Sequence, residues 1–172
     1  MQTIYLITTG GTIEKEYSEL LGVVHNNESK IAQYLRQLRL PGTDVRIVPL
    51  MNKDSLEMTS GERASLVGKV TELLPSMCPV IITHGTDTMV ASGILIKKSI
   101  QPLVVPVVLT GAMTPLGFEH SDGLQNLTES LIAARLLSSG VYVVMHGQVF
   151  PVTHTRKDPK LGTFVPIESS LW

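Results

Sequence analysis

The chain has 172 residues, of which 43% are hydrophobic and 17% are charged. This composition excludes an intrinsically disordered chain, which lacks the apolar residues to bury a core. Its formal net charge of -1 leaves no strong field to attract nucleic acid or an anionic membrane, so neither is expected as a partner. The single cysteine, Cys78, excludes an internal disulfide framework, and the dispersed histidines lack the spacing of a metal site. We therefore predict no metal and no cofactor.

We expect no signal peptide and no membrane-spanning segment. The N-terminus runs into the apolar residues at Ile4 without a basic segment, and no apolar stretch reaches the roughly 18–20 residues that span a bilayer. The length suits one domain. We expect a single soluble domain over residues 1–172, located in the cytoplasm.

Five short apolar runs predict the strands of a sheet. They are rich in β-branched residues and continuous rather than alternating, which is typical of strands covered on both faces. In chain order the runs are Thr3 to Thr8, Asp44 to Leu50, Val80 to Thr83, Leu103 to Leu109 and Val141 to His146.

Segments with helical character lie between these runs. A 3, 4 and 7 spacing of apolar residues predicts a helix over 28–38, and the capping box Thr59-Ser60-Gly61-Glu62 opens a helix that runs to about Leu74. Capping residues predict two more helices, one from Thr86 or Asp87 to about Lys98 and one from Asp122 to Leu137.

The alternation of strands and helices predicts an α/β fold. We expect a doubly wound parallel sheet in a flavodoxin/Rossmann-like three-layer sandwich, with the five predicted strands in the order 2-1-3-4-5. In such sheets ligands bind outside the carboxyl ends of the strands. The residues that follow each strand are therefore the first candidates for a functional site.

The first predicted strand ends in Thr8-Thr9-Gly10-Gly11-Thr12-Ile13. Two glycines allow a tight turn and a close approach of the backbone to a ligand. The spacing matches neither the dinucleotide fingerprint nor the phosphate-binding loop. A phosphate-binding turn and a plain glycine turn with capping threonines are both open alternatives here.

The third predicted strand ends in Thr83-His84-Gly85-Thr86-Asp87-Thr88. Its hydroxyl groups and its carboxylate stand at the start of a helix, where the helix dipole favours an ionised Asp87. A threonine hydroxyl is a weak nucleophile at its free pKa and needs a neighbouring base or cation. The alternative is that these residues only cap the helix.

Taken together, these segments resemble a known enzyme family. Thr9-Gly10-Gly11-Thr12-Ile13 and His84-Gly85-Thr86-Asp87-Thr88 resemble the two signature motifs of the asparaginase/glutaminase family of amidohydrolases, and Gly111-Ala112-Met113 and Asp122-Gly123 with Asn126 resemble further family segments. The resemblance covers nearly the whole chain and is greatest to the short, single-domain asparaginases, which lack the C-terminal domain of longer members. It implies a homodimer or homotetramer.

The resemblance also implies catalytic roles for particular residues. Thr12 would be the nucleophile, with Tyr17 on a mobile segment as its hydrogen-bonding partner. Thr86 would be the second catalytic threonine, and Asp87 would bind the α-amino group of the substrate. Lys157 would complete a relay with Thr86 and Asp87, and Lys160 and Arg156 are its competitors for that role, with a solvated basic loop as the structural alternative.

Substrate binding is implied for a second group of residues. The family binds the α-carboxylate on a Ser-Gln-Asp stretch after the second strand, where this chain has Asn52-Lys53-Asp54-Ser55. Glu14 is a second departure, because the family usually has a small residue there. Backbone N–H groups near Gly11 and Thr86 are the candidate oxyanion donors. The implied substrate-binding residues are Gly11, Asp54, Ser55, Gly85 and Ala112.

The expected function is hydrolysis of L-asparagine to L-aspartate and ammonia through a threonine acyl-enzyme. His84 and His146 stand at strand ends and are interpreted as structural residues. Four alternatives are open: a nucleotide- or phosphate-binding module, an amino-acid sensor without turnover, a glutaminase, and a component of a tRNA-dependent amidotransferase.

Overall fold

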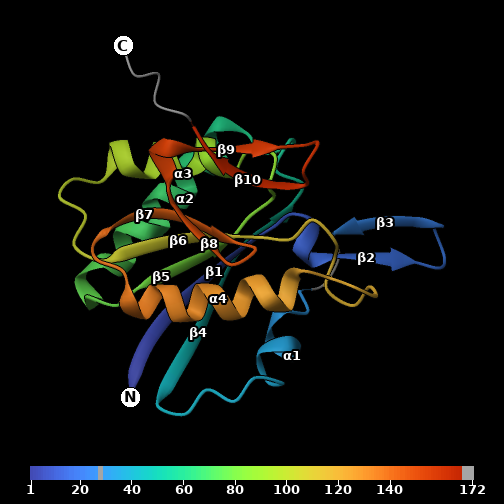
Figure 1. Ribbon diagram of the computed structural model, residues 1–172, viewed down its shortest axis with the longest axis horizontal. Coiled ribbons are helices and arrows are strands. Elements are labelled where there is room, and N and C mark those ends of the chain that lie inside the picture. The colour runs from blue at the N-terminus through green and yellow to red at the C-terminus, as the bar shows by residue number, and fades with distance from the viewer. Residues whose placement is uncertain (27–28, 168–172) are drawn as a thin grey trace.

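A six-stranded sheet forms the centre of the protein (Figure 1). The structure is a computed structural model that describes residues 1–26 and 29–167. Five strands are parallel, and the sixth, β8, runs antiparallel to β7. In spatial order the strands are β4 (Thr43–Lys53), β1 (Gln2–Gly10), β5 (Val80–Thr83), β6 (Pro106–Thr110), β7 (Gly140–Met145) and β8 (Gln148–Pro151). The mainly parallel sheet confirms the predicted fold class, and β8 is an addition to the predicted strands.

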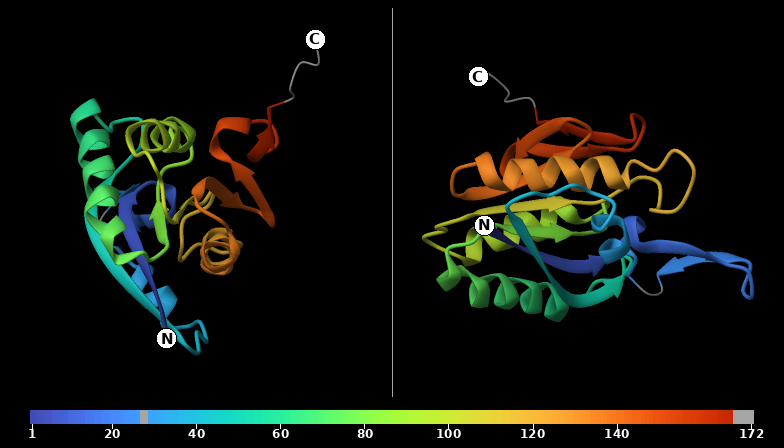
Figure 2. Two further views of the ribbon diagram at one scale, coloured as in Figure 1. Left: turned by 90° about the vertical axis from the view of Figure 1, so that its left-hand side faces the viewer. Right: turned by 90° about the horizontal axis from the view of Figure 1, so that it is seen from below.

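Helices cover both faces of the sheet and give three layers (Figure 2). The helices α2 (Ser60–Leu73) and α3 (Met89–Ser99) pack on one face, and α1 (Ile31–Leu35) and α4 (Gly123–Leu136) pack on the other. Successive residues of a strand therefore enter different core clusters: in β1, Leu6 packs on the α4 side and Ile7 on the α2 side. This double burial is why the strands are continuous apolar runs.

The start of α2 confirms the predicted capping box. The Thr59 hydroxyl accepts a hydrogen bond from the Glu62 N–H, and the Glu62 carboxylate accepts one from the Thr59 N–H. Contacts with Lys53 and then with Thr59 lower the pKa of Glu62 to about 2. Glu62 is therefore ionised at neutral pH, as the positive end of the helix dipole favours.

Three other helix ends differ from the prediction. The first helix is only Ile31–Leu35, and residue 28 of its predicted range lies outside the described residues. The third begins at Met89, because Thr86 and Asp87 form a turn and bind another part of the chain. Asp122 precedes α4, but its carboxylate accepts hydrogen bonds from Met113 and Thr114 rather than capping the helix.

Two antiparallel hairpins lie outside the main sheet. The first is β2 (Lys15–Ser18) with β3 (Val23–Asn26), which projects from the body of the protein (Figures 1 and 2). It follows a short 3-10 helix, Thr12–Glu14, at the end of β1. The second is β9 (Thr155–Asp158) with β10 (Thr163–Pro166), which packs beside α3 and buries Phe164 in the core.

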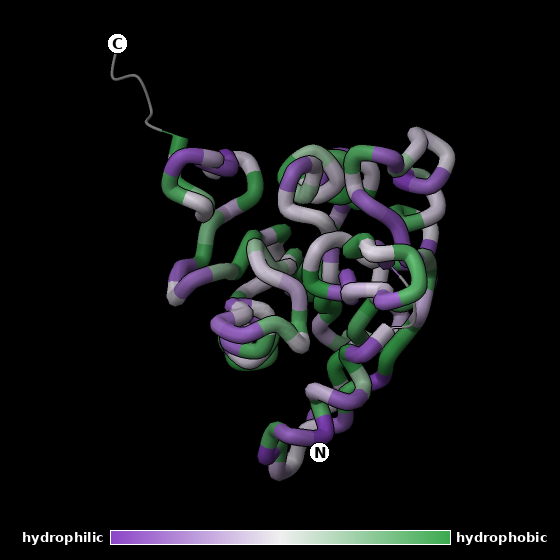
Figure 3. Tube along the Cα trace, turned by 90° about the vertical axis from the view of Figure 1, so that its right-hand side faces the viewer, coloured by the Kyte–Doolittle hydropathy of each residue, from purple (hydrophilic) through white to green (hydrophobic). Residues whose placement is uncertain are grey.

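The hydrophobic stretches of the chain are short. Figure 3 shows them broken by hydrophilic ones along the trace. Among residues 1–26 and 29–167, no helix combines the length and the apolar character needed to cross a bilayer.

Candidate active site

The ends of β1 and β5 meet at the carboxyl edge of the sheet, where Gly11 packs on Gly85. Gly11 has φ +79°, and a Cβ on it would overlap the backbone of Gly85. Gly10 has φ +94° and packs in the same way on the backbone of Lys53. Neither position tolerates a side chain without strain. The space that the two glycines leave free is filled by protein backbone, which favours a packing role for them over a phosphate cradle.

Lys157 joins the β9–β10 hairpin to the turn after β5. Its Nζ donates to Thr86 Oγ1 at 2.8 Å and to Asp87 Oδ1 at 2.7 Å. Lys160 is exposed at the end of the hairpin, and Arg156 pairs with Asp158 at 3.4 Å. Of the three candidate cations, the structure brings Lys157 into contact with the threonine and the aspartate.

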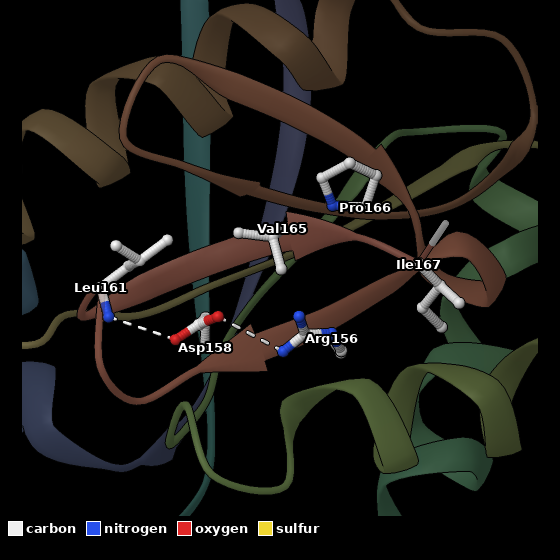
Figure 4. Close-up of a pocket in the computed structure, with 6 residues that line it drawn as sticks. All are labelled: Arg156, Asp158, Leu161, Val165, Pro166 and Ile167. Atoms are coloured by element: carbon white, nitrogen blue, oxygen red, sulfur yellow. Dashed lines mark hydrogen bonds and ion pairs between the residues drawn. The ribbon is translucent and has the colours of Figure 1, made fainter. Parts of the chain in front are cut away.

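A cavity of about 500 Å³ lies beside this contact. Thr86, Asp87 and Lys157 are among its lining residues, together with apolar residues of α3. A second cavity, of about 550 Å³, is formed by the β9–β10 hairpin and the residue that follows it (Figure 4). Its lining residues are Arg156, Asp158, Leu161, Val165, Pro166 and Ile167.

The segment after β4 lies against the same turn. Ser55 packs on the Cα of Gly85, and its buried Oγ has no hydrogen-bond partner among the described residues. Asp54 Oδ2 accepts a hydrogen bond from Lys15 Nζ at 2.6 Å. This bond, with one from the Leu56 N–H, holds the pKa of Asp54 below its ordinary value. An ionised Asp54 and an unpaired Ser55 hydroxyl thus follow one another in the chain.

Ala112 belongs to the loop after β6. Ala112 is fully buried. Its neighbour Gly111 packs on the carbonyl oxygen of His84, and a Cβ placed on Gly111 would lie 3.5 Å from the methyl carbon of Thr86. The loop is therefore adjacent to the Thr86 turn.

Tyr17 and Thr12 are not joined in this structure. Tyr17 stands on β2 with 57% of its surface exposed. Within residues 1–26 and 29–167, neither the Tyr17 hydroxyl nor the Thr12 hydroxyl makes a hydrogen bond. The hairpin is held to the body by Lys15, through Asp54, and by Asn26, whose Nδ2 donates to Gly11 O at 3.0 Å.

Two buried titratable residues lie at the base of the site. Glu14 Oε2 accepts a hydrogen bond from the Gly10 N–H at 2.9 Å, and burial raises the pKa of Glu14. Burial, together with the nearby charge of Arg63, lowers the pKa of His84 to about 4. His84 is therefore neutral at pH 7, with Nδ1 donating to Gly85 O and Nε2 left without a partner among the described residues.

His146 links two segments of the site. Its Nε2 lies 2.7 Å from Asp122 Oδ2, and its Nδ1 lies 2.7 Å from Thr163 Oγ1 on β10. Burial raises the pKa of Asp122, but hydrogen bonds from Met113, Thr114 and His146 outweigh it and hold the pKa below its ordinary value. His146 thus connects the loop after β6 with the hairpin that carries Lys157.

The sequence did not indicate the contacts of Lys15, Asn26, Arg63 or Thr163. Each is an ordinary polar residue in its local segment, and each contacts a partner that lies outside that segment. The Gly11 N–H, one of the candidate oxyanion donors, donates to Lys53 O at 2.8 Å and is already occupied. In the described part of the chain, no group of three His, Cys, Asp or Glu residues is arranged to hold a metal ion.

The chain is similar in sequence to known proteins. The family model "Asparaginase, N-terminal" matches residues 3–161. An L-asparaginase of Thermococcus kodakarensis is 28% identical over 92% of this chain and 48% of its own length. A component of the glutamyl-tRNA(Gln) amidotransferase of Methanococcus vannielii is 26% identical over 87% of this chain and 35% of its own length.

A solved structure extends the comparison to the fold. The structure of the thermostable L-asparaginase of Thermococcus kodakarensis superposes with a TM-score of 0.88 at 27% identity, covering 98% of this chain and 52% of that one. The chain spans about half the length of the asparaginases it matches. Because the family model accounts for most of its residues, the chain belongs to the asparaginase family.

Proposed function

We propose that this chain carries the site of an asparaginase that hydrolyses L-asparagine to L-aspartate and ammonia. The observation that supports it most is the contact of Lys157 Nζ with both Thr86 Oγ1 and Asp87 Oδ1, next to the glycine turn that precedes Thr12. A cation within hydrogen-bond reach of a threonine favours the ionised form that nucleophilic chemistry needs.

The proposed reaction has two steps. The Thr12 hydroxyl oxygen attacks the side-chain amide carbon of asparagine, and the C–N bond breaks as ammonia leaves with the threonine proton. Water then attacks the resulting ester, releases L-aspartate and returns the proton to Thr12. Lys157 and Thr86 orient the water and assist its deprotonation, within the roughly 10²–10⁴-fold range of general acid–base catalysis.

The oxyanion of each tetrahedral intermediate needs donors other than Gly11. The N–H groups of Thr12 and Thr86 have no acceptor in the part of the chain that the structure describes, and we assign them this role. Losing one such donor typically costs about 2.7–4 kcal/mol of transition-state stabilisation.

Substrate recognition is assigned to the charged and polar groups around Gly85. We propose that Asp87 and Asp54 attract the α-amino group and that the unpaired Ser55 hydroxyl donates to the α-carboxylate. Gly11, Gly85 and Ala112 shape the pocket by close packing. The exposed Tyr17 makes no hydrogen bond to Thr12 in this structure, so we propose that the β2–β3 hairpin closes on substrate and brings Tyr17 to Thr12.

The same site also suits two alternative functions, glutamine hydrolysis and transamidation. Glutamine differs from asparagine by one methylene, which changes discrimination by only about 1–3 kcal/mol. The similarity to an amidotransferase component also allows a role in transamidation with a partner protein. Cytoplasmic location is a further proposal, and assembly as a homodimer or homotetramer is one that the family resemblance implies.

Ammonia release tests the proposal. We expect wild type to release ammonia from asparagine faster than from glutamine, and Thr12→Ala and Thr86→Ala to lose at least about 10²-fold in kcat. Thr71→Ala, in the exposed face of α2, is the matched control. The mechanism is wrong if both site variants keep wild-type rates. Aspartate binding without any ammonia release would indicate an amino-acid sensor instead.

A further inference from the structure

Arg63 has an unusual set of partners close to the proposed substrate site. It stands in the first turn of α2 and is partly buried. Its Nη2 donates to the carbonyl oxygen of Ser55 at 3.2 Å and to that of Met58 at 3.4 Å. It also reaches two hydroxyl groups: Oγ1 of Thr88, the residue before α3, at 3.2 Å, and Oγ of Ser92 within α3 at 2.5 Å.

These contacts tie two segments of the site together. Ser55 lies on the segment after β4, and Thr88 follows directly on Thr86 and Asp87. The Thr88 hydroxyl itself donates to Ser55 O at 3.0 Å, so the guanidinium and the hydroxyl hold the same carbonyl group. The planar fork of arginine suits such a multiple contact, and lysine cannot reproduce it.

The charge of Arg63 is not neutralised nearby. Among the described residues, no carboxylate lies within ion-pair distance of its guanidinium, and all its partners are uncharged. A partly buried charge is screened less by solvent than an exposed one. Its field reaches neighbouring groups, since it contributes to the lowered pKa of His84.

We propose that Arg63 is a positioning and specificity-determining residue for the α-carboxylate of the substrate. It fixes Ser55 against the Thr86–Asp87 turn, and its unpaired positive charge behind Ser55 favours an anionic group at the unpartnered Ser55 hydroxyl. This inference rests on the proposed function, because Ser55 is assigned to the substrate only there.

The test compares two substrates that differ in charge at this position. L-Asparagine carries an α-carboxylate, and L-asparaginamide carries a neutral carboxamide in its place. We expect Arg63→Met to lower kcat/KM for asparagine by about tenfold, mostly through KM, as expected for losing one nearby charge. We expect kcat/KM for the amide substrate to change by less than about threefold, so the preference for asparagine over the amide falls.

Arg63→Lys separates charge from contacts. It keeps the positive charge but not the planar guanidinium. We therefore expect kcat/KM to change by a similar factor for both substrates, and the ratio of kcat/KM for asparagine to that for the amide to stay within about threefold of wild type. Arg135→Met, at an exposed position on α4, removes the same charge far from Ser55 and should leave kcat/KM unchanged for both substrates. Arg63→Gln replaces Arg63→Met if urea unfolding shows that the latter does not fold.

The outcomes distinguish this inference from the proposed function. If wild type releases no ammonia from asparagine, the proposed function fails. Suppose that wild type is active and that Arg63→Met lowers kcat/KM for both substrates by the same factor, or changes kcat/KM for neither. Arg63 then does not select for the carboxylate, and the inference is overturned.

Discussion

Lys157 Nζ lies 2.8 Å from Thr86 Oγ1, although 71 residues separate the two in the chain. The contact exists because the β9–β10 hairpin folds back beside α3 and anchors Phe164 in the core. One strand of this hairpin thus supplies a cation to a turn at the end of β5. The hairpin thereby places Lys157 next to Thr86 and the carboxylate of Asp87.

This contact makes Lys157→Met a sharp test. We expect kcat to fall by at least about 10²-fold, because Thr86 and the attacking water lose the cation that assists deprotonation. The melting temperature should change little, since partly exposed ion pairs contribute only about 0–1 kcal/mol. Lys160→Met, at the exposed end of the same hairpin, should keep wild-type kcat. Equal loss in both variants would remove Lys157 from the mechanism.

The pKa of Glu14 predicts an unusual effect of pH on stability. Burial raises this pKa in the folded protein above the ordinary value of 4.5. Between these two pKa values the folded protein holds a proton that the unfolded chain has released, so stability falls as pH rises through that window. Glu14→Gln cannot ionise and keeps an oxygen for the Gly10 N–H.

We therefore expect Glu14→Gln to be more stable than wild type at pH 7 to 8, with the difference shrinking as the pH falls toward 4.5. Urea unfolding midpoints across this range measure it. Glu119→Gln, on an exposed side chain, is the control and should show no such trend. A constant difference at every pH would mean that the carboxylate charge is not the cause.

Much of the fold could be predicted from local patterns. Strands buried on both faces leave continuous apolar runs, and Thr59 with Glu62 forms a capping box that depends only on neighbours in the chain. β8 was missed because the short segment Gln148–Pro151 gains its strand pairing from β7. The early start predicted for α3 was wrong because Thr86 and Asp87 bind Lys157, which no local pattern reveals.

The candidate site also contains some residues that the sequence indicated and some contacts that it did not. The family resemblance indicated Thr86, Asp87 and Lys157, and the structure brings these residues into contact. Their catalytic roles stay predictions. The contacts of Arg63 could not be predicted, because they depend on how α2 packs on α3.

The capping box of α2 predicts a loss of stability without a loss of activity. Thr59→Ala removes the hydroxyl that accepts the Glu62 N–H, which typically costs about 0.5–2 kcal/mol. The unfolding free energy measures this loss, and kcat at 25 °C should be unchanged. Thr71→Ala, later in the same helix, should cost less than about 0.5 kcal/mol. Because Arg63 stands in the same turn and its N–H donates to Thr59 O, a fall in kcat for Thr59→Ala would mean that the capping box is needed to position Arg63.

The His146 contacts predict that Thr163 positions the Lys157 hairpin. Thr163 pairs with Asp158, the residue after Lys157, and its hydroxyl lies 2.7 Å from His146 Nδ1. In the tautomer whose proton sits on Nε2 and is donated to Asp122, Nδ1 accepts the Thr163 proton. Thr163→Val cannot donate this proton, and we expect kcat to fall by about tenfold, the equivalent of 1.4 kcal/mol.

Two further variants make this prediction specific. Thr163→Ser keeps the hydroxyl and should retain wild-type kcat. Thr155→Val removes a hydrogen bond to Val165 O that lies wholly within the hairpin, so it should lower stability while changing kcat by less than about threefold. If Thr155→Val and Thr163→Val reduce kcat equally, the hairpin needs only its own rigidity, and the link from His146 to Asp122 plays no part in holding Lys157 at Thr86.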